Sequence, residues 1–347
     1  MRNYAYIQND KLRTIKSDWK GTPLDKNNRF MNHEFPFVPK FVDVLKWSIE
    51  RNPQRDEKKA DPFRLVHQDD KTFLEHDRDC LVWLGHSTFF LRMNGVNVLI
   101  DPVFYKIPFV KRYADHAFSP QTFSTLDYLL ISHNHQDHCQ EKSIREISAL
   151  NPGLTILSGL RMENLLAPWS KGATVQTAGW YQQYQTSDPL SIYYLPSRHW
   201  SKRSLNDTNR ELWGAFVFQT KDKTIYFSGD TGYGSHFKEA KELFPSIDIA
   251  IIGVGAYKPE WFMHVNHISP QDAVKAFHEL GAKTFIPMHY GTFDLSDEPV
   301  GEPVKLLKEA AKQNQINGEL KLLDLGENWL FNESFALAEK KHKSPNT

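Results

Sequence analysis

The sequence predicts a layered α/β fold, and two patterns support this prediction. Short apolar runs separated by turn residues begin near Cys80 and indicate consecutive β-strands. Helical patterns fall between the later runs, and this alternation after an opening series of strands is typical of layered α/β proteins. The chain has 347 residues, of which 40% are hydrophobic and 24% charged, so it can bury a large core without metals as staples. Any bound metal would therefore serve chemistry rather than folding.

The predicted strands are rich in aliphatic, β-branched and aromatic residues, and turn signals bound each of them. The longest apolar run, 247–254, has the length of a buried strand and falls far short of the ~18 residues that a membrane span needs. The strands are expected at 81–84, 88–91, 96–100, 128–131, 154–158, 191–196, 213–220, 224–228, 248–252 and 283–287.

Two helices have clear sequence signals. The segment 270–280 begins after Ser269, which forms a capping-box pattern with Asp272, and it ends before Gly281. The segment 40–51 is amphipathic, with apolar residues at helical spacing. Its stripe consists of Phe41, Val44, Leu45 and Ile49.

The chain divides into three parts by composition. Residues 1–75 are polar and turn-rich, and we expect an N-terminal extension packed on the main domain. Residues 76–332 form the main domain, and residues 333–347 are a polar C-terminal tail. No internal repeat or low-complexity segment is visible.

Charge and cysteine content limit the class of protein. Lys plus Arg and Asp plus Glu both number 42, so the basic excess typical of a nucleic-acid partner is missing. The two cysteines offer no disulfide framework, and no signal peptide is visible. We expect a cytoplasmic protein. Peripheral contact with the inner membrane surface and the oligomeric state are both left open.

Four ligand-capable side chains fall within six residues directly after the strand 128–131. Imidazole and carboxylate groups bind zinc and similar metals, and loops at strand ends are where a rigid scaffold displays catalytic groups. The alternative is a polar surface loop that happens to be rich in histidine, but this motif stands in the structural context of a metal site. The four residues are His133, His135, Asp137 and His138.

Three further predicted strands end near a ligand-capable residue. A single histidine is more often a structural residue than a ligand, but the repeated layout of an apolar strand followed by such a residue favours one common site. His199 comes after the strand 191–196, Asp230 after 224–228 and His289 after 283–287.

This series, His-x-His-x-Asp-His followed by a distant histidine, a Gly-Asp-Thr and a final histidine, resembles the metallo-β-lactamase superfamily. The resemblance implies an αββα sandwich, in which two mixed sheets are flanked by helices, and a site for two zinc ions, with iron or manganese as alternatives. By resemblance, His133, His135 and His199 hold one metal, Asp137, His138 and His289 hold the other, and Asp230 bridges them.

Further motifs resemble one branch, the N-acyl-phosphatidylethanolamine-hydrolysing phospholipases D and their bacterial relatives, over residues 80–330. The chain departs from the branch at Tyr290, where the mammalian enzymes carry Trp, at Ser269, and in the N-terminal extension. These departures concern the substrate and leave the metal ligands intact. The motifs are Gly85-His86-Ser87-Thr88, Ile131-Ser132-His133-Asn134-His135, Ser197-Arg198-His199-Trp200-Ser201-Lys202-Arg203, Leu212-Trp213-Gly214, Gly229-Asp230-Thr231-Gly232-Tyr233, Gly255-Ala256-Tyr257-Lys258-Pro259-Glu260-Trp261-Phe262-Met263 and His289-Tyr290-Gly291-Thr292-Phe293.

The branch implies a phospholipase D-type phosphodiesterase that acts on N-acyl-phosphatidylethanolamine or a related phospholipid. Two metals about 3.5–4 Å apart can clamp the attacking and leaving oxygens, and a metal-bound hydroxide would attack phosphorus. The residues expected to be catalytic are Asp137 and Asp230, as metal ligands, and His267, which matches a histidine of the branch.

Other residues are candidates for supporting roles. An Asp at the position of Asp101 supports a metal-binding histidine in this superfamily, although a plain turn residue at a strand end is an equal alternative. His86 has a similar position, with a buried structural histidine as its alternative. Aromatic residues near the motifs are candidates for a groove that holds acyl chains, and core packing is the alternative for each: Trp200, Tyr257, Trp261 and Tyr290.

Three alternative functions are open, and the first two use the same ligand set. A lactonase or a cyclic phosphodiesterase would hydrolyse another ester at the same site. An iron-loaded oxidoreductase would need a redox partner domain, and none is visible in the sequence. A non-enzymatic binding module predicts degraded ligands, yet every ligand position is filled.

Overall fold

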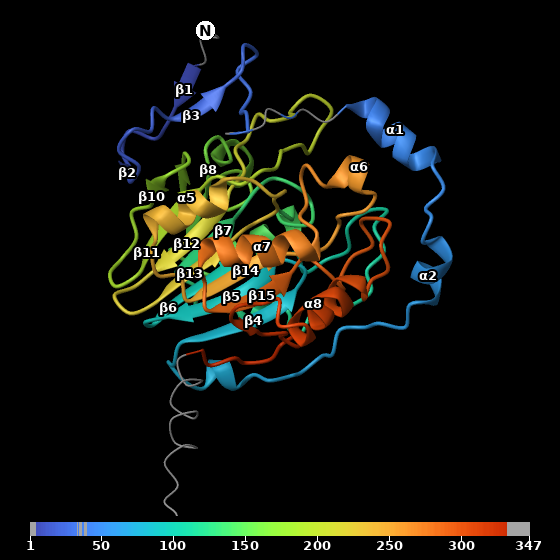
Figure 1. Ribbon diagram of the computed structural model, residues 1–347. Coiled ribbons are helices and arrows are strands. Elements are labelled where there is room, and N and C mark those ends of the chain that lie inside the picture. The colour runs from blue at the N-terminus through green and yellow to red at the C-terminus, as the bar shows by residue number, and fades with distance from the viewer. Residues whose placement is uncertain (1–4, 33, 35–36, 38–39, 332–347) are drawn as a thin grey trace, which may run out of the picture.

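Two mixed β-sheets pack face to face, and helices cover their outer sides, as the predicted α/β sandwich requires (Figure 1). The computed structural model describes residues 5–32, 34, 37 and 40–331, and the predicted C-terminal tail lies outside these residues. Every strand predicted from the sequence is present, with ends that differ by at most two residues.

The first sheet has six strands and holds the loop rich in histidine. Its first three strands are antiparallel and the others are parallel. β7 is therefore central, with neighbours on both sides. The order is β4 (Cys80–Gly85), β5 (Thr88–Met93), β6 (Val96–Ile100), β7 (Tyr128–Ile131), β8 (Thr155–Gly159) and β9 (Thr174–Ala178).

The second sheet has eight strands, and its last four in chain order are mutually parallel. Its far edge is β2, a strand from the predicted N-terminal extension, so this part of the extension continues the main sheet. A separate pair joins β1 (Ala5–Ile7) to β3 (Thr22–Leu24). The order is β16 (Glu319–Leu320), β15 (Thr284–Met288), β14 (Ile249–Gly253), β13 (Thr224–Phe227), β12 (Ala215–Gln219), β11 (Ser191–Leu195), β10 (Gln182–Gln183) and β2 (Arg13–Thr14).

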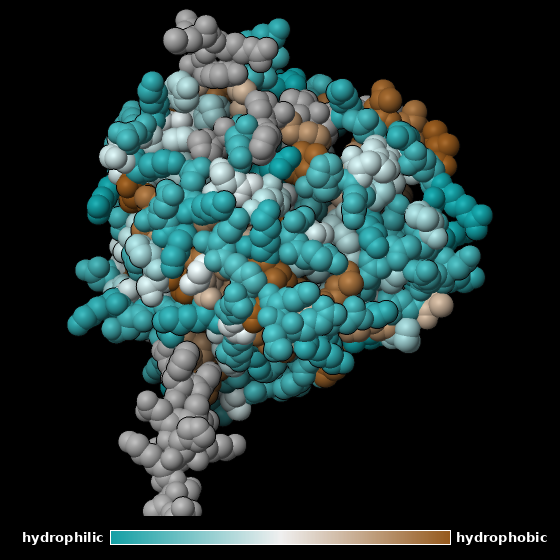
Figure 2. Space-filling view, in the orientation of Figure 1, coloured by the Kyte–Doolittle hydropathy of each residue, from teal (hydrophilic) through white to brown (hydrophobic). Residues whose placement is uncertain are grey.

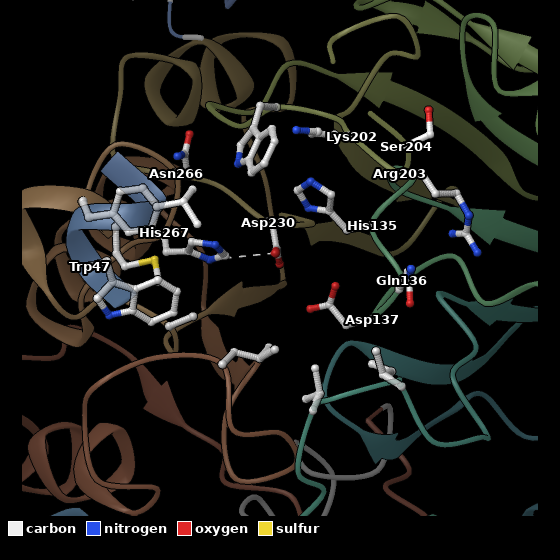
Figure 3. A pocket seen from close by; sticks show the side chains of 18 of the residues that line it. Trp47, His135, Gln136, Asp137, Lys202, Arg203, Ser204, Asp230, Asn266 and His267 are labelled. Atoms are coloured by element: carbon white, nitrogen blue, oxygen red, sulfur yellow. Dashed lines mark ion pairs between the residues drawn. The ribbon is translucent and has the colours of Figure 1, made fainter. Parts of the chain in front are cut away.

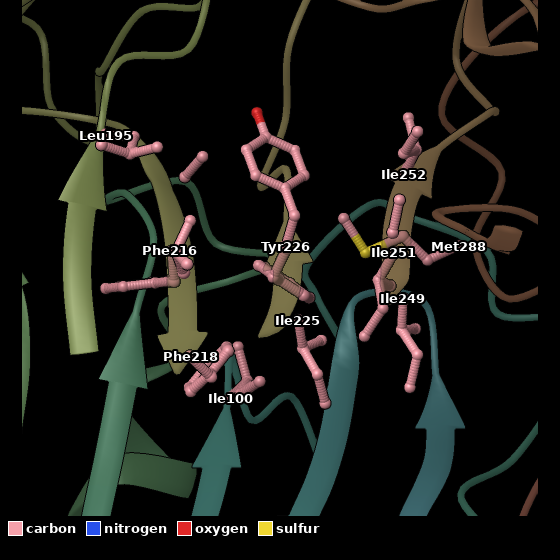
Figure 4. Close-up of a cluster of buried hydrophobic side chains, with 14 of the residues drawn as sticks. Ile100, Leu195, Phe216, Phe218, Ile225, Tyr226, Ile249, Ile251, Ile252 and Met288 are labelled. Atoms are coloured by element: carbon pink, nitrogen blue, oxygen red, sulfur yellow. The ribbon is translucent and has the colours of Figure 1, made fainter. Parts of the chain in front are cut away.

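The main core lies between the two sheets (Figure 4). Because side chains alternate along a strand, the strands β4 to β8 of the first sheet each serve two cores. In β7, Leu130 joins the core between the sheets, whereas Leu129 and Ile131 join a second core with Ile144 and Ile147 of α3 (Glu141–Leu150). This double burial explains why the strands appear in the sequence as continuous apolar runs.

The remaining helices complete the layers. The predicted caps of α7 are present, since the Ser269 hydroxyl accepts a hydrogen bond from the Asp272 amide (3.1 Å) and Gly281 has a left-handed conformation. The α-helices are α1 (Phe41–Ile49), α2 (Arg55–Ala60), α4 (Glu163–Leu166), α5 (His236–Leu243), α6 (Glu260–Met263), α7 (Pro270–Leu280) and α8 (Glu302–Lys312), and the 3-10 helices are η1 (Thr72–Leu74) and η2 (Pro120–Thr122).

Helix α1 forms where its periodicity predicts, but three residues of its apolar stripe are exposed. Val44, Leu45 and Ile49 are 40%, 48% and 75% exposed. The helix is held by Trp47, which donates a hydrogen bond to Asp297 Oδ1 (3.1 Å) and whose ring lies 5.5 Å from the ring of Phe262. Spacing alone therefore identified the helix but not the surroundings of its apolar face.

Candidate metal centre

The predicted metal ligands gather at one edge of the sandwich. β6 and β7 are parallel in the first sheet, and β13, β14 and β15 are parallel in the second, so their carboxyl ends lie at the same edge within each sheet. The packed sheets bring these two edges together. The side chains that meet there are His133, His135, Asp137, His138, His199, Asp230 and His289.

One group consists of three histidines. His135 Nδ1 lies 3.0 Å from His133 Nε2 and 3.2 Å from His199 Nε2. The backbone fixes the orientation of the His199 ring, because its Nδ1 lies 3.0 Å from the backbone oxygen of Asn266. Their ring nitrogens lie within 4.8 Å of one another, close enough to share one ion.

A second group surrounds Asp137. Its Oδ2 lies 3.6 Å from both His138 Nε2 and His289 Nε2. His86 lies closer still, with its Nε2 2.9 Å from Asp137 Oδ2. His86 thus holds the Asp137 carboxylate in place.

Asp230 lies between the two groups. Its Oδ1 lies 3.2 Å from His138 Nε2, and its Oδ2 lies 3.1 Å from His289 Nε2. The same Oδ2 lies 3.8 Å from His199 Nε2 and 4.0 Å from His133 Nε2. One carboxylate therefore faces histidines of both groups.

The donor atoms of these side chains fit metal ions. Buried polar atoms normally have hydrogen-bond partners, yet four ring nitrogens and one carboxylate oxygen here lack one of standard geometry among the described residues. They are Nε2 of His135 and His138, both ring nitrogens of His289, and Oδ1 of Asp230. Imidazole nitrogen and carboxylate oxygen are the ligands that zinc and iron accept.

Protonation states follow from burial and from neighbouring charges. Burial lowers the pKa of His135 to about 4 and that of His133 and His199 well below the usual value. Burial alone would raise the pKa of Asp137 and Asp230, but His138 holds both well below the usual range. Burial would lower the pKa of His138 and His289, but Asp230 and Asp137 raise that of His138 well above its usual value and that of His289 to about 9. Metals bind neutral imidazoles and ionised carboxylates, so a bound metal would displace the protons of these two rings.

The backbone is strained at three residues that directly follow strands. His86, Asp101 and His289 have φ angles of 53°, 42° and 62°, a region that is uncommon for residues other than glycine. Hydrogen bonds hold this conformation, since the His289 amide donates to the His86 oxygen (3.1 Å) and the Thr88 hydroxyl donates to the Asp101 oxygen (2.7 Å). Such strain of about 1–3 kcal/mol per residue persists mainly at functional sites.

A cavity of about 700 Å³ opens above the centre (Figure 3). His135, Asp137 and Asp230 lie at its floor, with His267 beside them, whose Nδ1 is 3.8 Å from Asp230 Oδ2. Burial lowers the pKa of His267 to about 4, so its imidazole is neutral at neutral pH. The rest of the lining includes the apolar side chains of Trp47, Trp200, Phe262 and Met263, and the basic side chains of Lys202 and Arg203.

The predicted aromatic candidates separate into two sets. Trp200 lines the cavity, and its ring lies 4.8 Å from that of His135. Tyr257, Trp261 and Tyr290 are not part of the lining. Tyr257 donates a hydrogen bond to Glu302, Lys46 lies over the Trp261 ring, and Tyr290 packs against Trp83 in the core.

Two segments of the lining were not predicted. Val44 and Trp47 come from α1, and Ile107, Pro108 and Val110 come from the loop after β6. The sequence could have indicated both segments, because each contains several apolar residues that belong to none of the predicted strands. Within the described ranges, no helix has both the length and the apolar character needed to cross a bilayer.

Comparisons with known proteins show the family to which the chain belongs. The model of the beta-lactamase superfamily domain matches residues 96–290. The chain is 30% identical over 309 residues to N-acyl-phosphatidylethanolamine-hydrolyzing phospholipase D 1 of Caenorhabditis elegans, covering 83% of this chain and 86% of that protein. It is 32% identical over 261 residues to the mitochondrial N-acyl-phosphatidylethanolamine-hydrolyzing phospholipase D of Saccharomyces cerevisiae, covering 72% of this chain and 55% of that protein.

Solved structures share the fold. A possible metal-dependent hydrolase from Veillonella parvula superposes with a TM-score of 0.60 at 17% identity, over 73% of this chain and 99% of the other. At this identity the likeness concerns the fold alone.

Proposed function

Because this chain belongs to the metallo-β-lactamase superfamily, in the branch of the N-acyl-phosphatidylethanolamine-hydrolysing phospholipases D, we propose that it hydrolyses a phosphodiester bond of N-acyl-phosphatidylethanolamine or a related phospholipid. The family motifs in the sequence thus identified the branch correctly. Membership makes the chain a metal-dependent hydrolase. The metal, the substrate and the roles of single residues are the proposal.

The proposed ligand set assigns the two groups of side chains to two zinc ions. His133, His135 and His199 would hold one ion, Asp137, His138 and His289 would hold the other, and Asp230 would serve both groups. Two observations support this assignment. Asp230 lies within 3.1–4.0 Å of ring nitrogens from both groups, and four ring nitrogens and one carboxylate oxygen of the set lack ordinary partners within the described part of the chain.

A pair of metal ions supplies a nucleophile from water near neutral pH and offsets the charge on the phosphoryl oxygens. The chain positions the reacting groups. Asp230 stays ionised beside the phosphate site, since its pKa is well below the usual range despite burial. His267 presents a neutral imidazole to the cavity and can exchange a hydrogen bond with the phosphate or with the leaving alcohol.

The observation that carries the substrate class is the mixed character of the cavity. Its floor holds the ligand-capable polar groups, while Trp47, Phe262 and Met263 form apolar walls. Such a space suits a phosphate group joined to apolar chains. Binding energy from the chains can then orient the reacting phosphorus.

Two basic residues line the same cavity but differ in role. The guanidinium of Arg203 donates to the backbone oxygens of Asn134 (3.1 Å) and Cys139 (2.6 Å), so it braces the loop of ligands. The ammonium of Lys202 also lines the cavity (Figure 3). We assign Lys202 to the negative charge of the phosphodiester.

The test is product analysis with metal-loaded protein in water enriched in ¹⁸O. Attack on phosphorus transfers the water oxygen to phosphatidic acid, and the N-acylethanolamine leaves with the original oxygen. Mass spectrometry should therefore find the label in phosphatidic acid. Asp230→Asn is the matched control, because it keeps the shape of the cavity floor but weakens the shared ligand.

Different substrates separate this proposal from its alternatives. If phospholipids stay intact while a sugar lactone or a cyclic nucleotide turns over, the chain is a hydrolase of another ester and the lipid assignment is wrong. Label in the alcohol product would place the attack on carbon and contradict the proposed chemistry.

A further inference from the structure

Three of the proposed ligand histidines have a polar partner at Nδ1, while their Nε2 atoms face other ligands. Metal-binding histidines almost always donate their second ring N–H to a carboxylate, a carbonyl oxygen or a water molecule, which fixes the orientation of the ring. The three pairs are His133 with Oγ of Ser132 (2.9 Å), His138 with Oδ2 of Asp101 (2.8 Å) and His199 with the backbone oxygen of Asn266 (3.0 Å).

His289 differs from these three histidines. Its Nε2 lies 3.1 Å from Oδ2 of Asp230 and is the nitrogen that would bind a metal. Its Nδ1 is buried and has no hydrogen-bond partner of standard geometry among the described residues. Because a buried N–H without a partner is costly, this nitrogen needs a partner of another kind.

A second, much smaller cavity lies beside His289. Its volume is about 20 Å³, which is room for one water molecule. His289 and Glu298 both line it, together with Gly255, Ala256 and Ser296. The cavity therefore lies between a proposed metal ligand and a carboxylate.

Glu298 is a buried residue that is not among the proposed metal ligands. It is 6% exposed, and backbone amides donate to both of its oxygens, from Ala256 to Oε1 (2.6 Å) and from Lys258 to Oε2 (3.1 Å). A carboxylate can accept about four hydrogen bonds. Glu298 therefore keeps the capacity to accept from another donor.

Glu298 also holds the chain beside His289. Ala256 has a φ angle of 60°, and Gly255 packs so closely that a Cβ atom there would lie 1.9 Å from the backbone oxygen of His289. The loop that Glu298 holds through two amides is therefore in contact with the backbone of His289.

We propose that one ordered water molecule occupies the small cavity, accepts a hydrogen bond from Nδ1 of His289 and donates one to the carboxylate of Glu298. The inference rests on the proposed function for the role of His289 as a metal ligand. Glu298 is then a positioning residue, because it acts on the metal through the water and His289. It keeps the proton on Nδ1 and leaves Nε2 free for the metal, as the direct contact from Asp101 does for His138.

The charges around the small cavity favour water over an ion. Lys58 of α2 also lines this cavity, and its ammonium pairs with Asp294 and donates to the backbone oxygen of Ser296. The ammonium disfavours a cation there, and the Glu298 carboxylate disfavours an anion. Water can enter from close by, since no residue of α2 is buried and hydrophilic side chains cover the right-hand edge of the molecule in Figure 2, where Figure 1 places this helix.

The first test is a crystal structure of the metal-loaded full chain at a resolution that shows ordered water. We expect one water oxygen about 2.7–3.2 Å from both Nδ1 of His289 and an oxygen of Glu298. A small cavity that holds no water, or a water bound to only one of the two groups, would overturn the proposal.

The second test is the variant Glu298→Gln, which keeps the size of the side chain but removes its charge and one acceptor oxygen. Chelator competition should show about 10–100-fold weaker binding of the ion assigned to His289 and unchanged binding of the other ion. A carboxylate that only braces the loop would lower the unfolding temperature without this difference between the two ions.

The matched control is Asp25→Asn. Asp25 Oδ1 also accepts from two backbone amides, those of Asn27 (2.8 Å) and Arg29 (2.9 Å), in a turn of the N-terminal extension. We expect both metal affinities of this control to stay unchanged. Equal weakening of both ions in Glu298→Gln, or no weakening, would contradict the positioning role. If that variant does not fold, the water position in the unmodified chain decides.

Both tests are made without substrate, so the two proposals fail differently. Selective loss of one ion in Glu298→Gln, by a chain that leaves phospholipids intact, supports the role of Glu298 and removes the substrate assignment. Lipid hydrolysis by a chain in which no water joins His289 to Glu298 removes the positioning role and leaves the proposed function intact.

Discussion

Asp101 Oδ2 lies 2.8 Å from Nδ1 of His138, and both side chains are completely buried. The opposite nitrogen of His138 faces Asp230 at 3.2 Å. Asp101 is itself fixed by the Ser132 amide (2.7 Å) and hydroxyl (2.6 Å). The carboxylate therefore sets the orientation of a proposed metal ligand, a role for which the sequence alone had an equal alternative.

Asp101→Asn should weaken one metal site and spare the other. Carboxylates that orient metal-binding histidines typically contribute 10–100-fold in affinity, so we expect a loss of about that size for one ion only. Chelator competition measures the two affinities. Asp248→Asn is the control, since this carboxylate binds the Thr224 amide at the start of a strand, outside the metal centre. Equal loss of both metals would contradict a local role for Asp101.

The purified chain should bind close to two zinc ions, because six ligand-capable side chains form two groups around a seventh, Asp230. Elemental analysis after reconstitution measures the number and kind of metal. A single ion after careful loading would contradict the shared-ligand arrangement. Iron in place of zinc would favour the oxidoreductase alternative.

Asp230→Asn should lower turnover by about 10²–10⁴-fold while the fold persists. The change removes the charge that faces both histidine groups and keeps the size of the side chain. Steady-state kinetics and circular dichroism measure the two effects. Asp69→Asn, at an exposed carboxylate, is the control. Turnover close to that of the unmodified chain would exclude Asp230 as the bridge.

His267→Gln should lower kcat by about 10²–10⁴-fold without reducing metal content, as expected for a group that exchanges protons or hydrogen bonds with the reacting atoms. His267 lines the cavity and its Nδ1 lies 3.8 Å from Asp230. Kinetics and metal analysis of the same sample give both readouts. Loss of an ion would instead make His267 a ligand.

Glu211→Gln should stabilise the protein at pH 8 and not at pH 4. Burial is the main cause that raises the pKa of Glu211 to about 7, above its usual 4.5, and the negative charge of Asp207 is the second cause. The protonated Glu211 carboxyl therefore contributes stability that is fully present below pH 4.5 and is lost as the pH rises through about 7. Above pH 7, Glu211→Gln should raise the free energy of unfolding by about 1 kcal/mol. The gain is no larger because solvent screens part of the cost of the ionised Glu211 carboxylate.

Thermal unfolding across this pH range measures the effect. Glutamine keeps an acceptor for the Asn134 amide, which donates to Glu211 at 3.2 Å. Glu75→Gln, at an exposed position, is the control. A gain that is equal at both pH values would have another cause.

Local pattern determined the elements and the kinds of side chain at the centre. Strands such as β6 and β7 were predictable because both faces are buried, which requires continuous apolar runs. The predicted ligands were readable because four of them lie within six residues of one loop, beginning at His133. Neither inference needs knowledge of distant contacts.

Only the tertiary structure decided which distant residues meet. His86 and Asp137 are 51 positions apart, and Asp101 and His138 are 37 apart, yet each pair lies within 2.9 Å. Helix α1 shows the same limit, since its spacing is that of a buried helix but the fold places it at the mouth of the cavity. Periodicity reports which side chains share a face, and long-range packing determines whether that face meets core, ligand or solvent.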